Sequence, residues 1–379
     1  MFGRRFIPIS RHTLVSGQPV IFPVYNKNGQ LLLDKGVIVS EQNLQTLADV
    51  DEIFTLNQEY QTASSKRNER EKNTAYHLPS PQKRLTSIED LLSEVYVNPQ
   101  HATSLSKILT ATNRLKMICE KSPDAAIAKI ILDDNENYTV RHSVHTAILS
   151  CLSALHLEWE DEDIRTLISA ALTMNISLGF MQDILVEQAE PLTSEQKDKI
   201  QTHPQDSADL LHEMGVQNME WIEIVAKHHE CIDGTGYPAS LIQDEIPMGA
   251  LIVSLSDIYC AKVSGRSYRQ PIFTNVAVRD IYLVKDQLSR GTLIEIFVKI
   301  LGLYPPGCFV KLASNELGLV VKRGNRVDTP VVQVLNITEK DKSLSNIKRR
   351  TDQEKFQITA IVPSDMMSIP MEYDQIWKN

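Results

Sequence analysis

The chain has 379 residues, of which 42% are hydrophobic and 23% charged, and its formal net charge is −9. These proportions are typical of a soluble globular protein with one large core and one or two small modules. The negative charge argues against a general nucleic-acid binder, whose affinity comes from neutralising phosphates. We find no apolar run long enough to cross a membrane, no signal-peptide pattern and no CxxC pair among the five cysteines. We therefore expect a cytoplasmic protein with reduced thiols.

The first part of the chain, residues 1–56, is predicted to form a small β-rich module. Strand candidates at residues 19–25 and 30–33 flank an Asn-Lys-Asn-Gly sequence, whose Asn-Gly step favours the positive φ values of a tight hairpin turn. A short helix capped by Ser40 should follow. Residues 57–86 lose the apolar pattern and carry a mixed charge run, so we expect a polar linker there.

Helical periodicity begins near Ser87 and dominates to about residue 303, which predicts a bundle of several helices. The capping box formed by Thr193 and Gln196 starts a helix that should end near His203-Pro204, before a separate helix over 208–214. Strand-like segments then indicate a small β-rich appendage over residues 304–379. The fold expected is mainly α, a helical bundle flanked by small β-rich modules at both ends.

The sequence HHECIDGTGYP, residues 228–238, is the most informative stretch of the chain. A helix-patterned run delivers two adjacent histidines at a helix end, and the glycines that follow break the helix. Imidazole is the commonest protein metal ligand, and burying two together requires partners for four ring nitrogens. The alternative interpretation is a surface helix end with histidines present by chance. The glycine–tyrosine–proline tail favours a metal site.

This stretch resembles the motif of the HD-GYP family, a branch of the HD metal-dependent phosphohydrolases. The resemblance extends from about His142 to Gly324. It implies an HD-GYP-like helical bundle over residues 87–303, with a two- or three-metal site that hydrolyses the bacterial second messenger cyclic di-GMP. Five residues of this chain match metal ligands of the family pattern: His142, His203, His228, His229 and Asp257.

The His-Asp pair of the family is missing from this sequence. The family segment has the form LLHDIGK, and its positions are occupied here by Met174, Asn175 and Leu178 where the family has histidine, aspartate and lysine. A thioether has little affinity for iron, manganese or magnesium, and a neutral amide cannot bridge two dications. Leucine cannot stabilise charge on a phosphate. The sequence therefore predicts a degenerate site.

Three of the matched histidines, His203, His228 and His229, remain a plausible ligand set for one ion such as zinc. We expect at most one divalent metal ion, zinc, manganese or iron, and a metal-free polar cluster stays open as the alternative. The resemblance also implies ligand contacts from Arg266 and Arg269, since guanidinium groups suit phosphate oxygens. The alternative for both arginines is that they lie in a solvated surface turn and bind no ligand. Three further residues are expected to shape the ligand pocket: Tyr237, Gly234 and Gly236.

Three functions remain open at this point. The preferred one is a non-catalytic HD-GYP protein that binds cyclic di-GMP or docks other signalling proteins. The second is an active metal-dependent cyclic di-GMP phosphodiesterase that uses a residual metal site, and the third is a purely structural interaction protein. Met174, Asn175 and Leu178 argue against the second, and Arg266 and Arg269 favour the first over the third. The sequence allows a homodimer.

Overall fold

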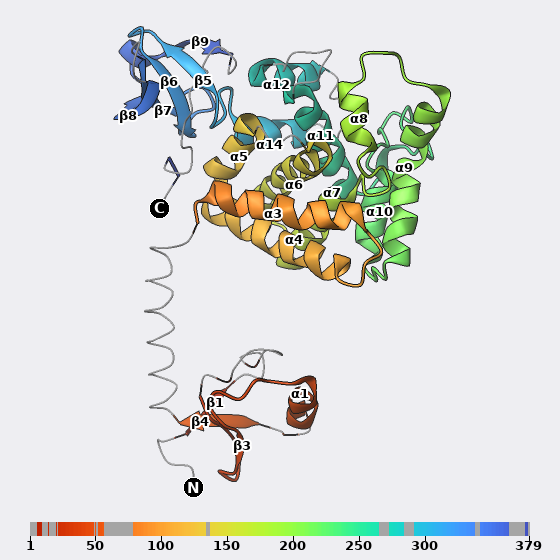
Figure 1. The fold of residues 1–379 in the computed structure, drawn as a ribbon. Helices are drawn as coiled ribbons and strands as arrows, with labels where there is room; N and C mark the ends of the chain where they lie inside the picture. The colour runs from red at the N-terminus through yellow and green to blue at the C-terminus, as the bar shows by residue number, and fades with distance from the viewer. Residues whose placement is uncertain are drawn as a thin grey trace. The chain divides into compact units, whose positions relative to one another are not determined.

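The computed structural model describes residues 6–9, 14, 20, 22–48, 50, 52–56, 79–133, 137–264, 273–283, 292–337, 342–363 and 376–377. These form two compact units, Met1–Leu78 and Pro79–Asn379, each of which is described by itself (Figure 1). None of the helices in these ranges is long and apolar enough to cross a membrane. The expected division at 1–56, 57–86, 87–303 and 304–379 stays a prediction.

The first unit holds a four-stranded antiparallel sheet of order β1-β4-β2-β3. The expected turn after β2 is present, because the Asn26 side-chain oxygen accepts hydrogen bonds from the amides of Asn28 and Gln30. Strand β2 is shorter than expected and starts at Val24, since Pro23 has no N–H to donate to a ladder. The elements are β1 (Phe6–Ile9), β2 (Val24–Asn26), β3 (Leu31–Leu33), α1 (Glu41–Ala48) and β4 (Ile53–Leu56).

The second unit is mainly a helical bundle, as the sequence predicts. Helix α6 runs through the middle of this bundle and is buried along almost its whole length (Figure 1). The bundle consists of α3 (Pro81–Val97), α4 (Ser104–Lys121), α5 (Pro123–Leu132), α6 (Tyr138–His156), α7 (Asp161–Thr173), α8 (Met181–Glu187), α9 (Ser194–Glu213), α10 (Met219–Lys227), the short 3₁₀ turn η2 (Gln243–Glu245), α11 (Met248–Val263), α12 (Thr274–Leu283) and α14 (Thr292–Leu301).

Two helix boundaries differ from the sequence-based expectation. Helix α3 begins at Pro81 rather than near Ser87, because the Ser80 hydroxyl accepts a hydrogen bond from the Lys83 amide at 3.2 Å and proline suits the first helical turn. Helix α9 starts at the predicted capping box of Thr193 and Gln196. It does not end at Pro204 but continues to Glu213, so the separate helix expected over 208–214 is wrong.

A five-stranded antiparallel sheet of order β8-β7-β6-β5-β9 completes the second unit. The Arg323 guanidinium bonds the Asp124 carboxylate at 2.6 Å and the Ile300 carbonyl at 3.1 Å, which fixes the sheet to α5 and α14. The elements are β5 (Phe309–Leu312), β6 (Leu317–Lys322), β7 (Val331–Ile337), β8 (Lys342–Arg350), the 3₁₀ turn η3 (Glu354–Phe356) and β9 (Ile358–Val362). The expected β-rich C-terminal appendage is confirmed.

Candidate functional site

A pocket of about 470 Å³ lies among α6, the end of α7, α8, α9, the loop after α10, and α11. Its walls bring together residues that are far apart in the sequence. Seven of the residues singled out from the sequence line it: His142, Asn175, Leu178, His203, His229, Tyr237 and Asp257.

His203 stands in the middle of α9, and the proline after it determines how its ring is held. Pro204 has no N–H to donate to the Ile200 carbonyl, one turn earlier in the helix. That carbonyl accepts instead from Nδ1 of His203, at 2.6 Å. A carbonyl can only accept, so the Nδ1 atom carries the hydrogen and Nε2 is left as a lone-pair donor. The helix therefore sets the tautomer of His203.

His228 is held in the same way at the end of α10. The Asn218 side chain caps the start of this helix, and His228 stands at its C-cap. Its Nδ1 donates to the Val225 carbonyl at 2.7 Å, so its Nε2 is also a lone-pair atom. The two Nε2 atoms of His203 and His228 lie 3.3 Å apart. His229 lies beside both, with ring centroids 4.2 Å from His228 and 5.0 Å from His203.

Burial disfavours the protonated, charged form of all three imidazoles. Burial, together with the neighbouring His228, lowers the pKa of His203 to about 3. Burial also lowers the pKa values of His228 and His229 below their usual range. Neutral imidazoles are the form that binds a metal.

This donor set fits a small divalent ion. One ligand nitrogen from each of His203, His228 and His229 lies within 4.8 Å of the other two. Two nitrogens bound to one tetrahedral zinc, at about 2.0–2.1 Å each, would be about 3.3 Å apart, close to the observed Nε2 separation. Two lone pairs at this distance repel each other unless a cation lies between them. The residues therefore fit a metal ion in chemistry and in spacing.

His142 and Asp257, two further lining residues, form a pair. Nε2 of His142 lies 2.5 Å from Oδ1 of Asp257, and Tyr138 stacks on the imidazole with ring centroids 5.2 Å apart. Burial opposes ionisation of Asp257, yet the hydrogen bond from His142 and the nearby imidazoles hold the pKa of this carboxyl well below its usual range. Asp257 is therefore an anion already engaged by His142.

The three positions that depart from the family pattern are distributed between the pocket and the core. Asn175 is 3% exposed and Leu178 is 7% exposed, and both line the pocket. Met174 is fully buried in the hydrophobic core and is not a lining residue. The pocket thus presents an amide and an alkyl group at the two positions where the resemblance implies an anion and a cation.

The loop after α10 is shaped by Glu230 and by two glycines. The buried Glu230 carboxylate accepts hydrogen bonds from the amides of Ala239 and Leu241, at 2.7 and 2.9 Å. A side chain at Gly236 would place its Cβ 2.3 Å from the Cys231 nitrogen, and Gly234 has a φ of 78°. Neither glycine lines the pocket. Their direct ligand contact stays a prediction, and the contacts described indicate a role in loop shape.

Tyr237 follows this loop and does line the pocket. Its ring stacks on His229, with centroids 4.7 Å apart and an interplanar angle of 22°. Burial raises the pKa of its hydroxyl, so the side chain stays neutral. The other two expected ligand contacts, Arg266 and Arg269, lie outside the described residues.

Sequence reasoning missed one wall of the pocket. Helix α8 and the segment after it contribute Gln182, Leu185, Val186 and residues 188–192. Tyr138, at the start of α6, was missed as well. No motif marks these residues, and the short α8 has no strong periodicity. Only the spacing of Tyr138 four residues before His142 on one helix could have suggested contact.

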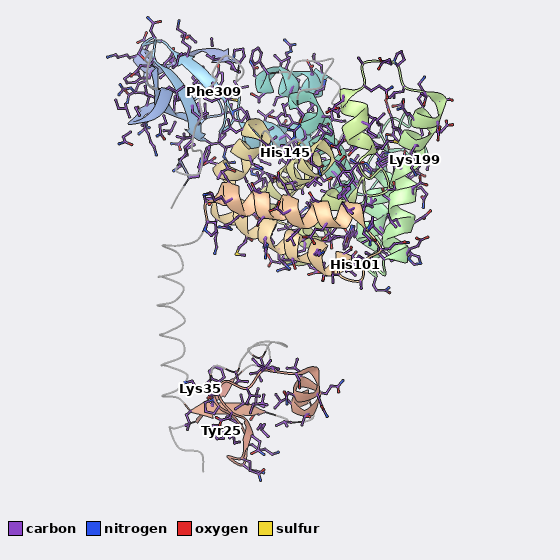
Figure 2. The ribbon with its side chains drawn as sticks, viewed as in Figure 1. Tyr25, Lys35, His101, His145, Lys199 and Phe309 are labelled. Carbon is purple, nitrogen blue, oxygen red and sulfur yellow. The ribbon has the colours of Figure 1, made fainter. Side chains whose placement is uncertain are left out.

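A second ionisable cluster lies inside the bundle, outside the pocket. Lys129 on α5 bonds the Glu89 carboxylate at 3.1 Å and the Asp133 carboxylate at 2.9 Å. Figure 2 labels His145, which lies on α6 one turn beyond His142. Its Nε2 atom is 3.0 Å from Oδ2 of Asp133. Although Glu89, Asp133 and His145 have the composition of a metal site, the Lys129 ammonium already contacts both carboxyl groups. We interpret this cluster as a structural ion network.

Parts of the chain are similar to known proteins. Residues 125–288 match the family described as HD domain. The chain is 30% identical over 215 residues to the cyclic di-GMP phosphodiesterase PA4108 of Pseudomonas aeruginosa, covering 56% of this chain and 52% of the relative. It is 23% identical over 185 residues to the cyclic di-GMP phosphodiesterase PdeB of Borreliella burgdorferi, covering 49% and 48%. The chain spans about half the length of these curated relatives.

Among solved structures, the fold is similar to that of Bd1817, described as a HDG"Y"P protein from Bdellovibrio bacteriovorus. The TM-score is 0.52 at 20% sequence identity, and the alignment covers 78% of this chain and 99% of that one. At this identity the likeness shows the fold alone.

Proposed function

This chain belongs to the HD domain superfamily and has the HD-GYP type of fold, and from that premise we propose that it is a non-catalytic member of cyclic di-GMP signalling. It binds the ligand in the pocket over the three histidines without cleaving it, and it acts on other signalling proteins as a binding or interaction module. We also propose that the protein is cytoplasmic and forms a homodimer.

One observation carries the non-catalytic assignment: Asn175 and Leu178 stand on the pocket wall. Two-metal hydrolysis of a phosphodiester holds two cations about 3.5–4 Å apart, which requires an anionic bridge between them. The Asn175 amide is neutral, and the Asp257 carboxylate is engaged by His142 at 2.5 Å. With Leu178 nearby, no ammonium from that position stabilises charge on the phosphate. The residues support one ion and not two.

The proposal includes one divalent ion held by His203, His228 and His229. Zinc and iron suit imidazole ligands better than manganese does. When bound, such an ion would act as a Lewis acid on an oxygen of the ligand. The protein's own contribution is to orient the lone pairs, through the bonds from the two Nδ1 atoms to the carbonyls of Ile200 and Val225.

The alternative function is an active metal-dependent cyclic di-GMP phosphodiesterase. The same three-imidazole set favours it, since one well-held ion supports slow hydrolysis without a second. The names of the curated relatives are consistent with it as well. The two functions differ in one measurable property, the turnover of cyclic di-GMP.

The test combines elemental analysis of the purified protein with a binding and a turnover assay. We expect cyclic di-GMP to bind by calorimetry and to remain intact with added zinc, manganese or iron. Hydrolysis by the parent protein that His228→Ala abolishes would establish the alternative. The matched control is His212→Ala, which removes an exposed histidine on α9. Absence of binding would contradict both proposals.

Arg266 and Arg269 provide a second test of ligand binding. The resemblance places them at a phosphate-contacting turn, so we expect the double alanine variant to weaken cyclic di-GMP binding. Removing one partner of a buried charged hydrogen bond costs about 2–5 kcal/mol. Unchanged affinity by calorimetry would show that this segment does not contact the ligand.

A further inference from the structure

We propose that a groove between α4, α7 and the turn from α9 to α10 docks a basic amphipathic helix of a partner protein. An apolar side chain of this helix enters the groove, and its lysine or arginine side chains lie beside it. Among the described residues, none lines both this groove and the pocket over the three histidines. The inference therefore adds a second site, and it rests on the proposed function only in giving the interaction module a surface.

The groove is small and is open to solvent along α4. Its volume of about 290 Å³ lies just below the range of about 300–1,000 Å³ that is usual for small-molecule pockets. Leu105 and Leu109, one turn apart on the same face of α4, form its apolar edge, and Leu109 is 45% exposed. Apolar surface that stays exposed in this way is typical of a protein interaction site.

The floor of the groove is apolar or already hydrogen-bonded. The buried Trp221 indole donates its N–H at 2.8 Å to a threonine hydroxyl on α7. The hydroxyls of Thr112 and Ser169 bond each other at 2.9 Å, and Nδ2 of Asn218 donates to the Thr166 hydroxyl at 2.8 Å. Because these polar groups have partners inside the protein, a side chain that enters the groove gains free energy mainly by burying apolar surface.

The surface beside the groove carries an excess of negative charge. Glu162 lines the groove, and Asp163 on α7 and Glu220 on α10 are chain neighbours of the lining residues Glu162 and Trp221. Burial raises the pKa of Glu220, and the negative charges of Asp163 and Glu223 raise it as well. The carboxylates of the two helices therefore lie close enough to repel one another, and a cation from outside would relieve this repulsion.

The cations of the protein nearest the groove are already engaged. Arg165, the one lysine or arginine among the described lining residues, bonds Asp161 at 3.2 Å and lies 3.5 Å from Glu162. Lys116 on α4 pairs with the same Asp161 at 2.9 Å. A partner that brings its own lysine or arginine is therefore attracted, whereas an acidic segment or a nucleic acid is repelled.

A helix suits this groove better than an extended strand. The walls are helices, whose backbone groups are bonded internally and offer no edge to which a strand could be added. An amphipathic helix needs no such edge, because its apolar stripe enters the groove and its charged side chains lie on either side. The leucine pair on α4 gives that stripe a row of side chains to pack against.

The experiment is calorimetry of the 379-residue chain with three blocked helical peptides. The first consists of leucine and lysine with a single leucine stripe, the second has alanine in place of leucine, and the third has glutamate in place of lysine. We expect the leucine–lysine peptide to bind at least about tenfold more tightly than either of the others. Its affinity should fall as the salt concentration rises from about 50 to 300 mM, because the carboxylates are exposed.

One variant tests the apolar edge of the groove. Leu109→Ser removes exposed apolar surface and should lower the affinity for the leucine–lysine peptide about tenfold. The matched control is Met117→Ser, because Met117 is 42% exposed on the same helix and does not line the groove. Thermal unfolding of both variants verifies that the fold is intact.

A second variant tests the charge beside the groove. Asp163→Asn combined with Glu220→Gln should lower the affinity about fivefold and weaken its dependence on salt. The control combines Glu195→Gln with Asp198→Asn, which removes the same charge from exposed positions at the start of α9, the opposite end of that helix from the groove.

Equal binding of the three peptides, no binding of the leucine–lysine peptide, or unchanged affinity in either folded test variant would overturn the inference. Self-association of the parent protein that Leu109→Ser abolishes would assign the groove to a second copy of the chain and would overturn it as well. Cyclic di-GMP binding without peptide binding would overturn this inference and leave the proposed ligand binding standing. The reverse result would support the inference and remove cyclic di-GMP as the ligand.

Discussion

The Nε2 atoms of His203 and His228 face each other at 3.3 Å, and both rings donate Nδ1–H to backbone carbonyls. Both tautomers are thus set by the helices that carry the residues. Neither imidazole can turn a hydrogen toward the other without giving up its carbonyl bond. A cation between the two nitrogens converts a repulsive contact into two favourable ones. The first two predictions depend on this relationship.

The first prediction concerns metal content. We expect no more than about one ion per chain in protein purified without added metal, because Asn175 cannot bridge a pair. His203→Ala should remove uptake, whereas His212→Ala should not. At a free metal concentration of 100 times Kd, binding should stabilise the fold by about 2.7 kcal/mol, which thermal unfolding would detect. Two or more tightly held transition-metal ions per chain by elemental analysis would contradict the prediction.

The second prediction concerns the proline after His203. Pro204→Ala supplies an N–H that competes with His203 for the Ile200 carbonyl, so the ring should be held less firmly. Loss of such an orienting partner typically lowers metal affinity about 10–100-fold. The fold should be retained, since alanine favours a helix interior. Unchanged affinity by competition with a chelator would show that this hydrogen bond does not organise the site.

The third prediction concerns catalysis. The parent protein should not cleave cyclic di-GMP, and the combined variant Met174→His, Asn175→Asp and Leu178→Lys should take up more metal. Any single reversion should restore little, because groups that act as a unit are strongly non-additive. Met174 lies in the core, so its reversion tests whether a histidine at this position can reach the pocket. Full metal uptake by Asn175→Asp alone would contradict the expected cooperation.

The fourth prediction concerns pH and the cluster around Lys129. Burial, assisted by the nearby Asp133, raises the pKa of Glu89 from 4.5 to about 7. The folded protein therefore keeps a proton that the unfolded chain releases above pH 4.5, and this stabilisation is lost as the pH rises through about 7. Relative to Glu89→Gln, the parent should lose up to about 3 kcal/mol of unfolding free energy between pH 5 and 8.

Urea unfolding of both proteins at the two pH values measures this difference. Taking the difference between variants removes the contribution of titrating groups that do not interact with Glu89. Glu94→Gln, at an exposed position on the same helix, is the control. A difference between parent and Glu89→Gln that is independent of pH would show that Glu89 does not keep its proton in the folded state.

The fold class and the identity of the candidate ligands could be predicted from the sequence because both depend on local information. Apolar periodicity indicates helices, and the capping box of Thr193 and Gln196 marks the start of α9. The asparagine at position 175, where the family pattern has aspartate, can be read directly from the sequence. The loss of catalysis expected from this substitution stays a prediction.

The tertiary structure alone decided which atoms meet. The sequence predicted a helix end at Pro204, yet packing carries α9 past it, and only then does the proline free a carbonyl for His203. Gln182 lines the pocket only because the α8 segment is joined to α6 and α9. Glu89 and His145 come together only across α3, α5 and α6. In each case the energy depends on contacts between segments far apart in the chain, which no local pattern records.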